Sequence, residues 1–316
     1  MSAPFPPPGT GTPTPRTSFP AGPHGLVVAA PAKLNLYLEV LGKRPDGFHD
    51  LETLMVGLNL YDTLEVRPRA DDQLRLTCDR PDLPTGPENL VCKAASGLRQ
   101  FVQRPELGAD LHLAKRIPAQ AGLAGGSSDA AAALVALNRV WNLNLSRAAL
   151  ALVAADVGSD VAFFLSLPAG WCTGRGEHVA PEPPGAGFHV VLVLPPVGLS
   201  TPAVFRQLTP PATPRSGDPI RQAFRAGDVV ALGAALFNRL EEPAFALAPD
   251  VDRVYRRLAA LDPVGCLMSG SGSAVFAVCR DPHDAARVAA GVRAAAPPDE
   301  PPSHVLVART LTPDPA

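Results

Sequence analysis

The sequence predicts an α+β fold of two domains, and three observations support this. First, the chain has 316 residues, which is enough for two domains that each bury a hydrophobic core. Second, strand-like and helix-like segments are interspersed without the regular βαβ alternation of a doubly wound sheet. Third, the stretch PEPPGAG at 181–187 separates an earlier block of elements from a later one. We therefore expect domains at residues 25–180 and 181–311.

The first 24 residues are predicted to form a disordered extension. The stretch MSAPFPPPGTGTPTPRTSFPAGPH consists mainly of proline, glycine and small polar residues. Such a composition buries too little apolar surface to offset the entropy that is lost on ordering. The folded chain is therefore expected to begin near Gly25.

The first domain is predicted to open on a strand, because apolar residues recur at every second position from Leu34 to Val40. Polar or aromatic residues fill the positions between, so this strand is expected to be half-buried. Asn89 is well placed to cap a later helix. The other elements expected here are strands at 62–68, 73–78 and 110–116 and helices at 88–102, 128–140 and 146–157.

The second domain is predicted to combine a small sheet with helices. An apolar run at 188–194 predicts a strand, and two more strands are expected around the turn SGSGS at 269–273. The remaining expected elements are helices at 218–227, 228–240, 251–261 and 282–295 and a last strand at 303–309.

Charge and cysteine content exclude several classes of protein. The 28 lysines and arginines are balanced by 30 aspartates and glutamates, so no overall basic field attracts nucleic acid or an anionic membrane. The five cysteines lack the paired spacing of a zinc site or a redox motif. No apolar run reaches the roughly 20 residues of a membrane span, and the start lacks the pattern of a signal peptide. These features predict a soluble, cytoplasmic protein that binds anions only at a local site.

A glycine-rich stretch, PAQAGLAGGSS at 118–128, is the candidate for such a site. Its glycines allow a tight backbone turn whose N–H groups approach a ligand closely. The helix that follows has unpaired N–H groups and the positive end of its dipole at its start, which together favour phosphate. In the simpler alternative, Ser127 or Ser128 only caps a buried alanine-rich helix. The stretch matches neither the P-loop nor the dinucleotide fingerprint.

Three further segments occur in an order that is typical of one family. PAKLNLYLEVLGKRPDGFHDLETLM (31–55), GSDVAFFL (158–165) and LMSGSGSAVFAV (267–278) flank the glycine-rich stretch. Together they resemble the GHMP kinase superfamily of small-molecule kinases, over roughly residues 26–310. The part RPDGFHDLETLM resembles the branch that phosphorylates 4-diphosphocytidyl-2-C-methyl-D-erythritol in non-mevalonate isoprenoid synthesis.

The resemblance implies a fold, a reaction and a set of site residues. The implied fold has an N-terminal ATP-binding domain like domain 2 of ribosomal protein S5 and a ferredoxin-like C-terminal GHMP domain. The implied reaction transfers the γ-phosphoryl group of ATP, with Mg2+, to the 2-hydroxyl of the cytidylyl substrate. Lys33 and Asp160 match the catalytic positions of the family. The residues expected at ATP are Pro118, Ala119, Gln120, Ala121, Gly122, Leu123, Ala124, Gly125, Gly126, Ser127, Ser128, Asn89 and Lys115, and those expected at the substrate are Asn35, Phe48, His49, Ser271 and Gly272.

The catalytic residues suit this chemistry, although each has a simpler interpretation. Lys33 and Asn35 lie two apart on a strand, so their side chains point to one face, where most polar side chains are merely solvated. Asp160 follows a predicted helix and could cap a short one after it. In a kinase, a carboxylate accepts the proton of the hydroxyl group, and a neighbouring lysine keeps it ionised and offsets phosphoryl charge.

The remaining candidates have simpler interpretations as well. Phe48 and His49 offer a ring face and a hydrogen-bonding edge to cytosine, although such a pair more often joins a core residue to a surface neighbour. The family commonly has tyrosine before this histidine, so Phe48 keeps the stacking surface and lacks a hydroxyl. Asn89 could only cap a helix, and Lys115 could be a surface lysine. Ser128 is a candidate Mg2+ ligand for which the sequence suggests no acidic partner.

Two other functions remain open from the sequence. One is phosphorylation of a different alcohol, such as mevalonate, homoserine or a sugar, and the segment RPDGFHDLETLM argues against it. The other is non-catalytic nucleotide or RNA binding, which the near-neutral charge and the presence of both Lys33 and Asp160 disfavour. The sequence leaves both a monomer and a homodimer open.

Overall fold

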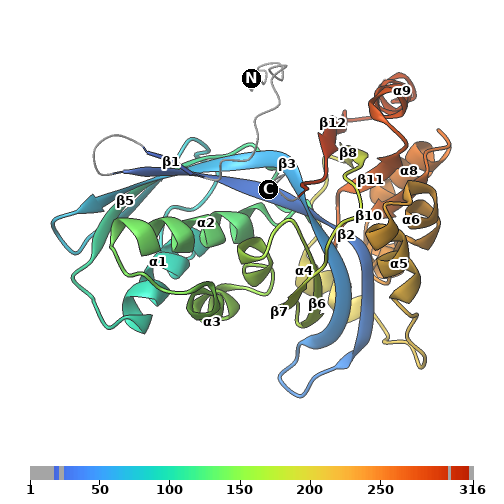
Figure 1. Ribbon diagram of the computed structural model, residues 1–316. Coiled ribbons are helices and arrows are strands. Elements are labelled where there is room, and N and C mark those ends of the chain that lie inside the picture. Colours follow the sequence, from blue (N-terminus) through green and yellow to red (C-terminus); the bar gives the residue numbers. More distant parts are fainter. Residues whose placement is uncertain (1–17, 21–24, 298–299, 313–316) are drawn as a thin grey trace.

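A computed structural model describes residues 18–20, 25–297 and 300–312 of the chain. Two sheets form the framework, and helices lie against each of them (Figure 1). In the described part of the chain, no helix has both the length and the hydropathy needed to cross a bilayer.

The predicted N-terminal extension is described only in part. Residues 1–17 and 21–24 lie outside the described residues, so the prediction of disorder stays a prediction there. Ser18–Pro20 forms strand β1, which runs antiparallel to Leu26–Val28. The structure differs from the prediction at these residues, because pairing at the edge of a sheet uses backbone groups and does not require apolar side chains.

The first sheet is built around one long antiparallel hairpin, β2 (Leu26–Lys43) and β3 (His49–Arg69). Both strands are longer than predicted, and their far ends extend beside the second domain (Figure 1). The sheet order is β1-β2-β3-β5-β4, while β6 pairs with β3, β7 with β6, and β9 with β2. The bounds are β4 (Leu74–Cys78), β5 (Gly108–Ala114), β6 (Ala169–Gly174), β7 (His178–Pro181) and β9 (Phe237–Asn238).

Three helices and a short 3-10 helix lie on one side of the first sheet, and the last of the three helices packs mainly on the other helices rather than on the strands (Figure 1). They are α1 (Leu90–Phe101), α2 (Gly125–Val140), α3 (Arg147–Val157) and η1 (Ala162–Leu165). As predicted, Asn89 caps α1, and its Oδ1 accepts a hydrogen bond from the Val91 N–H group at 2.9 Å. Helix α2 begins earlier than predicted, after Ala124, which has a left-handed φ of 53° and makes no side-chain cap. The alternative in which Ser127 or Ser128 caps this helix is therefore wrong.

The second sheet has the antiparallel order β10-β11-β8-β12. Its strands are β8 (His189–Leu194), β10 (Gly265–Met268), β11 (Val275–Cys279) and β12 (His304–Arg309). The helices of this part of the chain are α4 (Thr201–Gln207), α5 (Asp218–Ala226), α6 (Val229–Ala235), α7 (Glu241–Leu247), α8 (Pro249–Ala259) and α9 (Pro282–Ala294). The strand predicted at 188–194 and the strands around 269–273 are confirmed.

The helix predicted over 228–240 is wrong beyond Ala235. Phe237 and Asn238 instead form β9, which pairs in parallel with β2. The Asn238 side chain bonds to nearby backbone groups, and bonding of this kind competes with helix formation. The later part of the chain thus adds a strand to the first sheet, and the domain limits predicted at 180 and 181 stay a prediction.

Strand β2 is buried on both faces, where the sequence predicted a half-buried strand. Leu34 and Leu36 belong to a core that also contains Phe276 of the second sheet. On the other face, Lys33 is 3% exposed and Asn35 is 1% exposed. The alternation of apolar and polar residues was correct, but the polar face is covered because the glycine-rich stretch and the second domain meet over it.

Glu241, the first residue of α7, carries a partly buried carboxyl group. Its Oε1 accepts a hydrogen bond from the Met268 N–H group at 2.8 Å. Burial raises the pKa of Glu241 from 4.5 to about 7, against the opposing effect of that hydrogen bond. Between these two pH values the native state therefore holds a proton that the unfolded chain has released.

Replacing this carboxyl group should change how stability depends on pH. In the wild type, the stabilisation by Glu241 is fully present below pH 4.5 and is lost as the pH rises to about 7. Glutamine keeps an acceptor for Met268 but does not titrate. The free energy of unfolding of Glu241→Gln, relative to the wild type, should therefore rise by about 1–2 kcal/mol between about pH 5 and about pH 8.

Urea unfolding at the two pH values measures this difference. Glu242→Gln, at the exposed neighbouring carboxylate, is the matched control and should show no such change. An equal pH dependence in the two variants would contradict the expectation.

Candidate active site

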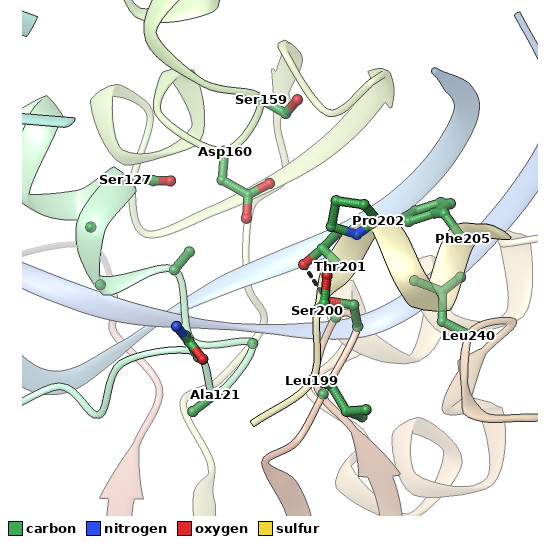
Figure 2. Close-up of a pocket in the computed structure, with 18 of the residues that line it drawn as sticks. Ala121, Ser127, Ser159, Asp160, Leu199, Ser200, Thr201, Pro202, Phe205 and Leu240 are labelled. Carbon is green, nitrogen blue, oxygen red and sulfur yellow. Dashed lines mark hydrogen bonds between the residues drawn. The ribbon is translucent and has the colours of Figure 1, made fainter. Parts of the chain in front are cut away.

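A pocket of about 1270 Å³ lies where the glycine-rich stretch, the β2–β3 hairpin and the second domain meet. Figure 2 shows Asp160 pointing into it, between Ser127 at the start of α2 and helix α4. Of all the predicted site residues, only Leu123 and Ser128 do not line this pocket, and both are 1% exposed. The fold thus brings together residues that lie far apart in the sequence.

Lys33 and Asp160 face each other in the pocket. Lys33 Nζ lies 3.6 Å from Asp160 Oδ2 and donates a hydrogen bond to Asn35 Oδ1 at 2.5 Å. Asn35 Nδ2 in turn donates to Thr53 Oγ1 at 2.7 Å, and the Thr53 hydroxyl donates to the carbonyl oxygen of Tyr37. Burial lowers the pKa of Lys33, while Asp160 acts in the opposite direction. The ammonium group is therefore held in one place and depends on Asp160 for its charge balance.

Asp160 reaches the pocket because α3 ends just before it. Gly158, the residue after α3, has an extended backbone, and the chain then turns into η1. The residue that precedes η1 is Val161, and no side chain caps this short helix. The simpler interpretation of Asp160 as a helix cap is therefore wrong, and its side chain is 29% exposed, facing Lys33.

The glycine-rich stretch is held from both domains by backbone contacts. The Lys33 N–H group donates to the carbonyl oxygen of Leu123 at 3.1 Å, and the Ala274 N–H group donates to that of Ala121 at 3.2 Å. A Cβ atom on Gly122, whose φ is +73°, would lie 2.1 Å from the carbonyl oxygen of Ser269. Only glycine fits there, so the close approach of the two domains explains this glycine. The stretch runs into the start of α2, where free N–H groups favour an anion.

Lys115 is the centre of a buried charge cluster and not a surface lysine. It is 8% exposed, and its ammonium group is paired with Asp62 and lies 2.7 Å from Asp129 Oδ2. Asp62 Oδ1 also accepts hydrogen bonds from the N–H groups of Arg116 and Ile117, at 2.5 and 2.8 Å. Burial raises the pKa of Asp129 to about 7. The cluster joins β3, the chain after β5, and α2 beneath the glycine-rich stretch.

Asn89 is both a helix cap and a residue of the pocket wall. It caps α1, and its Nδ2 donates to the carbonyl oxygen of Pro84 at 2.7 Å. It also lines the pocket beside Leu83, Pro84 and Leu90, which form an apolar end near the glycine-rich stretch. An apolar wall of this kind suits the flat base of a nucleotide.

Aromatic side chains gather at the other end of the pocket. The rings of His49 and Phe205 stack with their centroids 5.0 Å apart. Phe48 is 50% exposed, and the guanidinium group of Arg175 lies 5.0 Å from its ring centroid. Burial and then the charge of Lys43 lower the pKa of His49, which favours the neutral ring. A neutral imidazole has one donor and one acceptor for the edge of a base.

Phe205 was missed by the sequence analysis. It lies on α4, more than 150 residues after His49, so only the folded chain brings the two rings together. A signal was present, because Ser200, Thr201 and Pro202 are typical of the start of a helix and Phe205 follows within its first turns.

Ser271 and Gly272, which were predicted to bind the substrate, line the pocket from the second domain. They belong to the turn between β10 and β11. The hydroxyl groups of Ser271 and Thr201 share a hydrogen bond of 2.7 Å, which links this turn to the start of α4 (Figure 2). The turn therefore lies between the glycine-rich stretch and the helix that carries Phe205.

Two side-chain oxygens near the start of α2 are candidate ligands of a metal ion. Ser128 Oγ and Asp129 Oδ1 are buried and have no hydrogen-bond partner among the described residues. Oxygen is the ligand atom that Mg2+ prefers. The described residues contain no group of three or more His, Cys, Asp or Glu side chains that could hold a metal ion. An ion bound by these oxygens would therefore also need oxygens of a phosphate group and of water.

Family models and relatives match most of the chain. The model of the GHMP kinases N terminal domain matches residues 89–166, and that of the GHMP kinases C terminal domain matches residues 220–298. A 4-diphosphocytidyl-2-C-methyl-D-erythritol kinase of Pelotomaculum thermopropionicum is 42% identical over 290 residues, which cover 91% of this chain and 99% of the relative. A protein of the same name from Streptomyces coelicolor is 38% identical over 280 residues, which cover 85% of this chain and 92% of the relative.

Solved structures agree with this match. A crystal structure of 4-(cytidine 5'-diphospho)-2C-methyl-D-erythritol kinase has a TM-score of 0.75 and 35% identity, covering 90% of this chain and 98% of that one. A homoserine kinase of Cytophaga hutchinsonii has a TM-score of 0.72 at 18% identity, covering 93% and 96%, and shares the fold alone. The predicted α+β fold is confirmed, and so is the resemblance of the sequence to the GHMP kinases. This chain belongs to the GHMP kinases and, within them, to the family of 4-diphosphocytidyl-2-C-methyl-D-erythritol kinases.

Proposed function

We propose that this chain transfers the γ-phosphoryl group of ATP to the 2-hydroxyl group of 4-diphosphocytidyl-2-C-methyl-D-erythritol, giving the 2-phosphate and ADP. The observation that carries the proposal is the convergence of Lys33 and Asp160 beside a stretch of backbone N–H groups in one pocket. The family supplies the acceptor, and the aromatic end of the pocket supports a cytidine base. The reaction takes place in the cytoplasm, where ATP is available.

Asp160 accepts the proton of the acceptor hydroxyl group. A carboxyl group with a pKa near 3.9 in water is a weak base toward an alcohol, so the proton moves late, when the bond from oxygen to phosphorus has begun to form. The Lys33 ammonium group attracts the Asp160 carboxyl group and offsets the charge on the transferred group. Both effects are strong because Lys33 is almost removed from water.

The glycine-rich stretch holds the phosphates of ATP with its backbone N–H groups and the start of α2. Phosphoryl transfer needs mainly alignment and charge stabilisation, which a rigid backbone cradle provides. Lys115 supports this cradle indirectly. Its ammonium group is shared between Asp62 and Asp129, so it joins β3 to the start of α2 instead of binding phosphate itself. Asn89 lies where the pocket is lined by apolar residues and faces the base of ATP.

Mg2+ neutralises the phosphate charge of ATP when it is bound. Ser128 Oγ and Asp129 Oδ1 are the protein oxygens that would hold it, because both are buried and lack a partner within the described residues. The remaining ligands would be phosphate oxygens and water.

The choice of acceptor tests the proposed function directly. ADP release should require the cytidylyl substrate and should be absent with mevalonate, homoserine or free methylerythritol phosphate, because these compounds lack a base for the aromatic end of the pocket. A coupled assay with each alcohol and ATP measures this. Turnover of one of the other alcohols at an equal or higher kcat/KM would overturn the proposal.

The catalytic roles predict large losses of turnover. Asp160→Asn and Lys33→Ala should each lower kcat by about 10²–10⁴-fold and change the KM for ATP less than about threefold. The kcat of the double variant should be little lower than that of the less active single variant, because the two groups act as a unit. The exposed Asp156→Asn, on α3 and outside the pocket, is the control. Turnover within about threefold of wild type in either single variant, with ATP binding intact by calorimetry, would refute the assignment.

The aromatic end predicts an effect on the acceptor alone. Stacking of a base on an aromatic ring contributes about 1–3 kcal/mol, so Phe205→Ala should raise the KM for the cytidylyl substrate about tenfold or more. The KM for ATP should stay within about twofold, because the two ends of the pocket bind different molecules. Initial rates at varied substrate measure both constants. Phe101→Ala, at an exposed ring on α1 outside the pocket, is the control, and an equal rise in both KM values for Phe205→Ala would count against the stacking role.

A further inference from the structure

Asn238 lies outside the pocket, yet it holds a turn that lines it. The residue is 4% exposed, and its Nδ2 donates hydrogen bonds to the carbonyl oxygens of Met268 and Gly270, at 2.8 and 2.7 Å. Its Oδ1 accepts a hydrogen bond from the Leu240 N–H group at 2.9 Å. Both amide hydrogens and the amide oxygen are therefore used. We call these three hydrogen bonds the bracket, because they hold the turn at Ser269–Gly272 from outside the pocket.

This turn lies beside the side chains of Lys33 and Asn35 and against the glycine-rich stretch. A Cβ atom on Gly270 would lie 3.3 Å from both Lys33 Nζ and Asn35 Oδ1. On its other side, the Ser269 hydroxyl donates to the carbonyl oxygen of Gly122 at 3.0 Å. The turn thus leaves little room for a side chain at Gly270 beside Lys33, and it is bonded to the glycine-rich stretch through Ser269. A shift of the turn would therefore displace the lysine relative to the phosphates.

The bracket is itself fixed to the strand that carries Lys33. Asn238 pairs with Leu38 of β2, and the Arg239 N–H group donates to the Leu38 carbonyl oxygen at 2.8 Å. The guanidinium group of Arg239 makes two hydrogen bonds to the fully buried Glu39, at 2.8 and 2.7 Å. A buried bidentate pair of this kind fixes geometry strongly. The turn of the second domain is in this way held in register with β2.

We propose that Asn238 is a positioning residue for phosphoryl transfer, which holds the Ser269–Gly272 turn in register with Lys33. The inference rests on the proposed function and goes beyond it, because Asn238 does not line the pocket. Misplacement of reacting groups by about 1 Å can cost about 10²-fold in rate. Loss of the bracket therefore acts on kcat, while binding of the substrates at the two ends of the pocket is retained.

Asn238→Asp is the informative variant. It keeps the shape of the side chain and the acceptor for Leu240, but a carboxylate cannot donate to the two carbonyl oxygens. We expect kcat to fall about 10–100-fold, with the KM for ATP and for the acceptor and the affinity for ATP by calorimetry each within about threefold. Asn238→Ser retains one donor and should show a smaller fall in kcat, so it serves as a second variant where the aspartate variant does not fold.

Asn138→Ala is the matched control. Asn138 Nδ2 donates to the carbonyl oxygen of Leu145 at 3.1 Å, and its Oδ1 accepts from the Leu145 N–H group at 2.9 Å. The bonds are of the same kind, but they lie near the far end of α2 and outside the pocket. This variant should lower Tm and leave kcat unchanged.

Wild-type turnover of the cytidylyl acceptor is measured first, so that two failures are distinguished. Its absence overturns the proposed function and this inference with it. With an active wild type, a kcat within about threefold in Asn238→Asp and Asn238→Ser overturns the inference alone. A rise in both KM values at an unchanged kcat would also overturn it, because it would place Asn238 in substrate binding.

Discussion

The buried ammonium group of Lys33 is the constraint on which the rest of the site depends. A cation that is 3% exposed has lost its hydration and needs an opposite charge at close range. Asp160 supplies that charge, but it follows α3, more than a hundred residues later in the chain. The pair can therefore form only when α2 packs on the first sheet and α3 and η1 pack on α2. The site therefore acquires its charge pair only when the first domain has folded.

The two ends of the pocket differ in whether backbone or side-chain atoms form them. The end assigned to ATP consists mainly of backbone, which is fixed by contacts such as the close approach of Gly122 to Ser269. The end assigned to the acceptor consists of side chains, with His49 on β3 and Phe205 on α4. Backbone geometry depends on the fold, whereas side chains can change one at a time. The first end is therefore tied to the architecture, and the second is free to differ between proteins that share it.

The sequence predicted the parts of this structure that depend on local pattern. The alternation along 34–40, the cap at Asn89 and the glycine-rich stretch before α2 were all visible in it. What it did not predict depends on contacts between distant segments. The polar face of β2 is buried because a second domain covers it, and Lys115 is buried because Asp62 and Asp129 arrive from other elements. Neither fact leaves a trace in the local pattern of residues.

At the segment around Asn238, local pattern made a wrong prediction because contacts with distant segments decide the structure. Its apolar spacing is helical, and a helix was predicted through it, yet the chain leaves the helix at Ala235 to pair with β2. The cost of giving up helical hydrogen bonds is offset by the bonds of Asn238 to Met268 and Gly270 and by the buried pair of Arg239 with Glu39. The helical preference of this segment is overridden because β2 pairs with its backbone groups and its side chains gain these tertiary bonds. A helix prediction that fails inside a well-packed domain therefore helps to locate candidate functional residues. It marks a segment where tertiary contacts outweigh the local helix propensity.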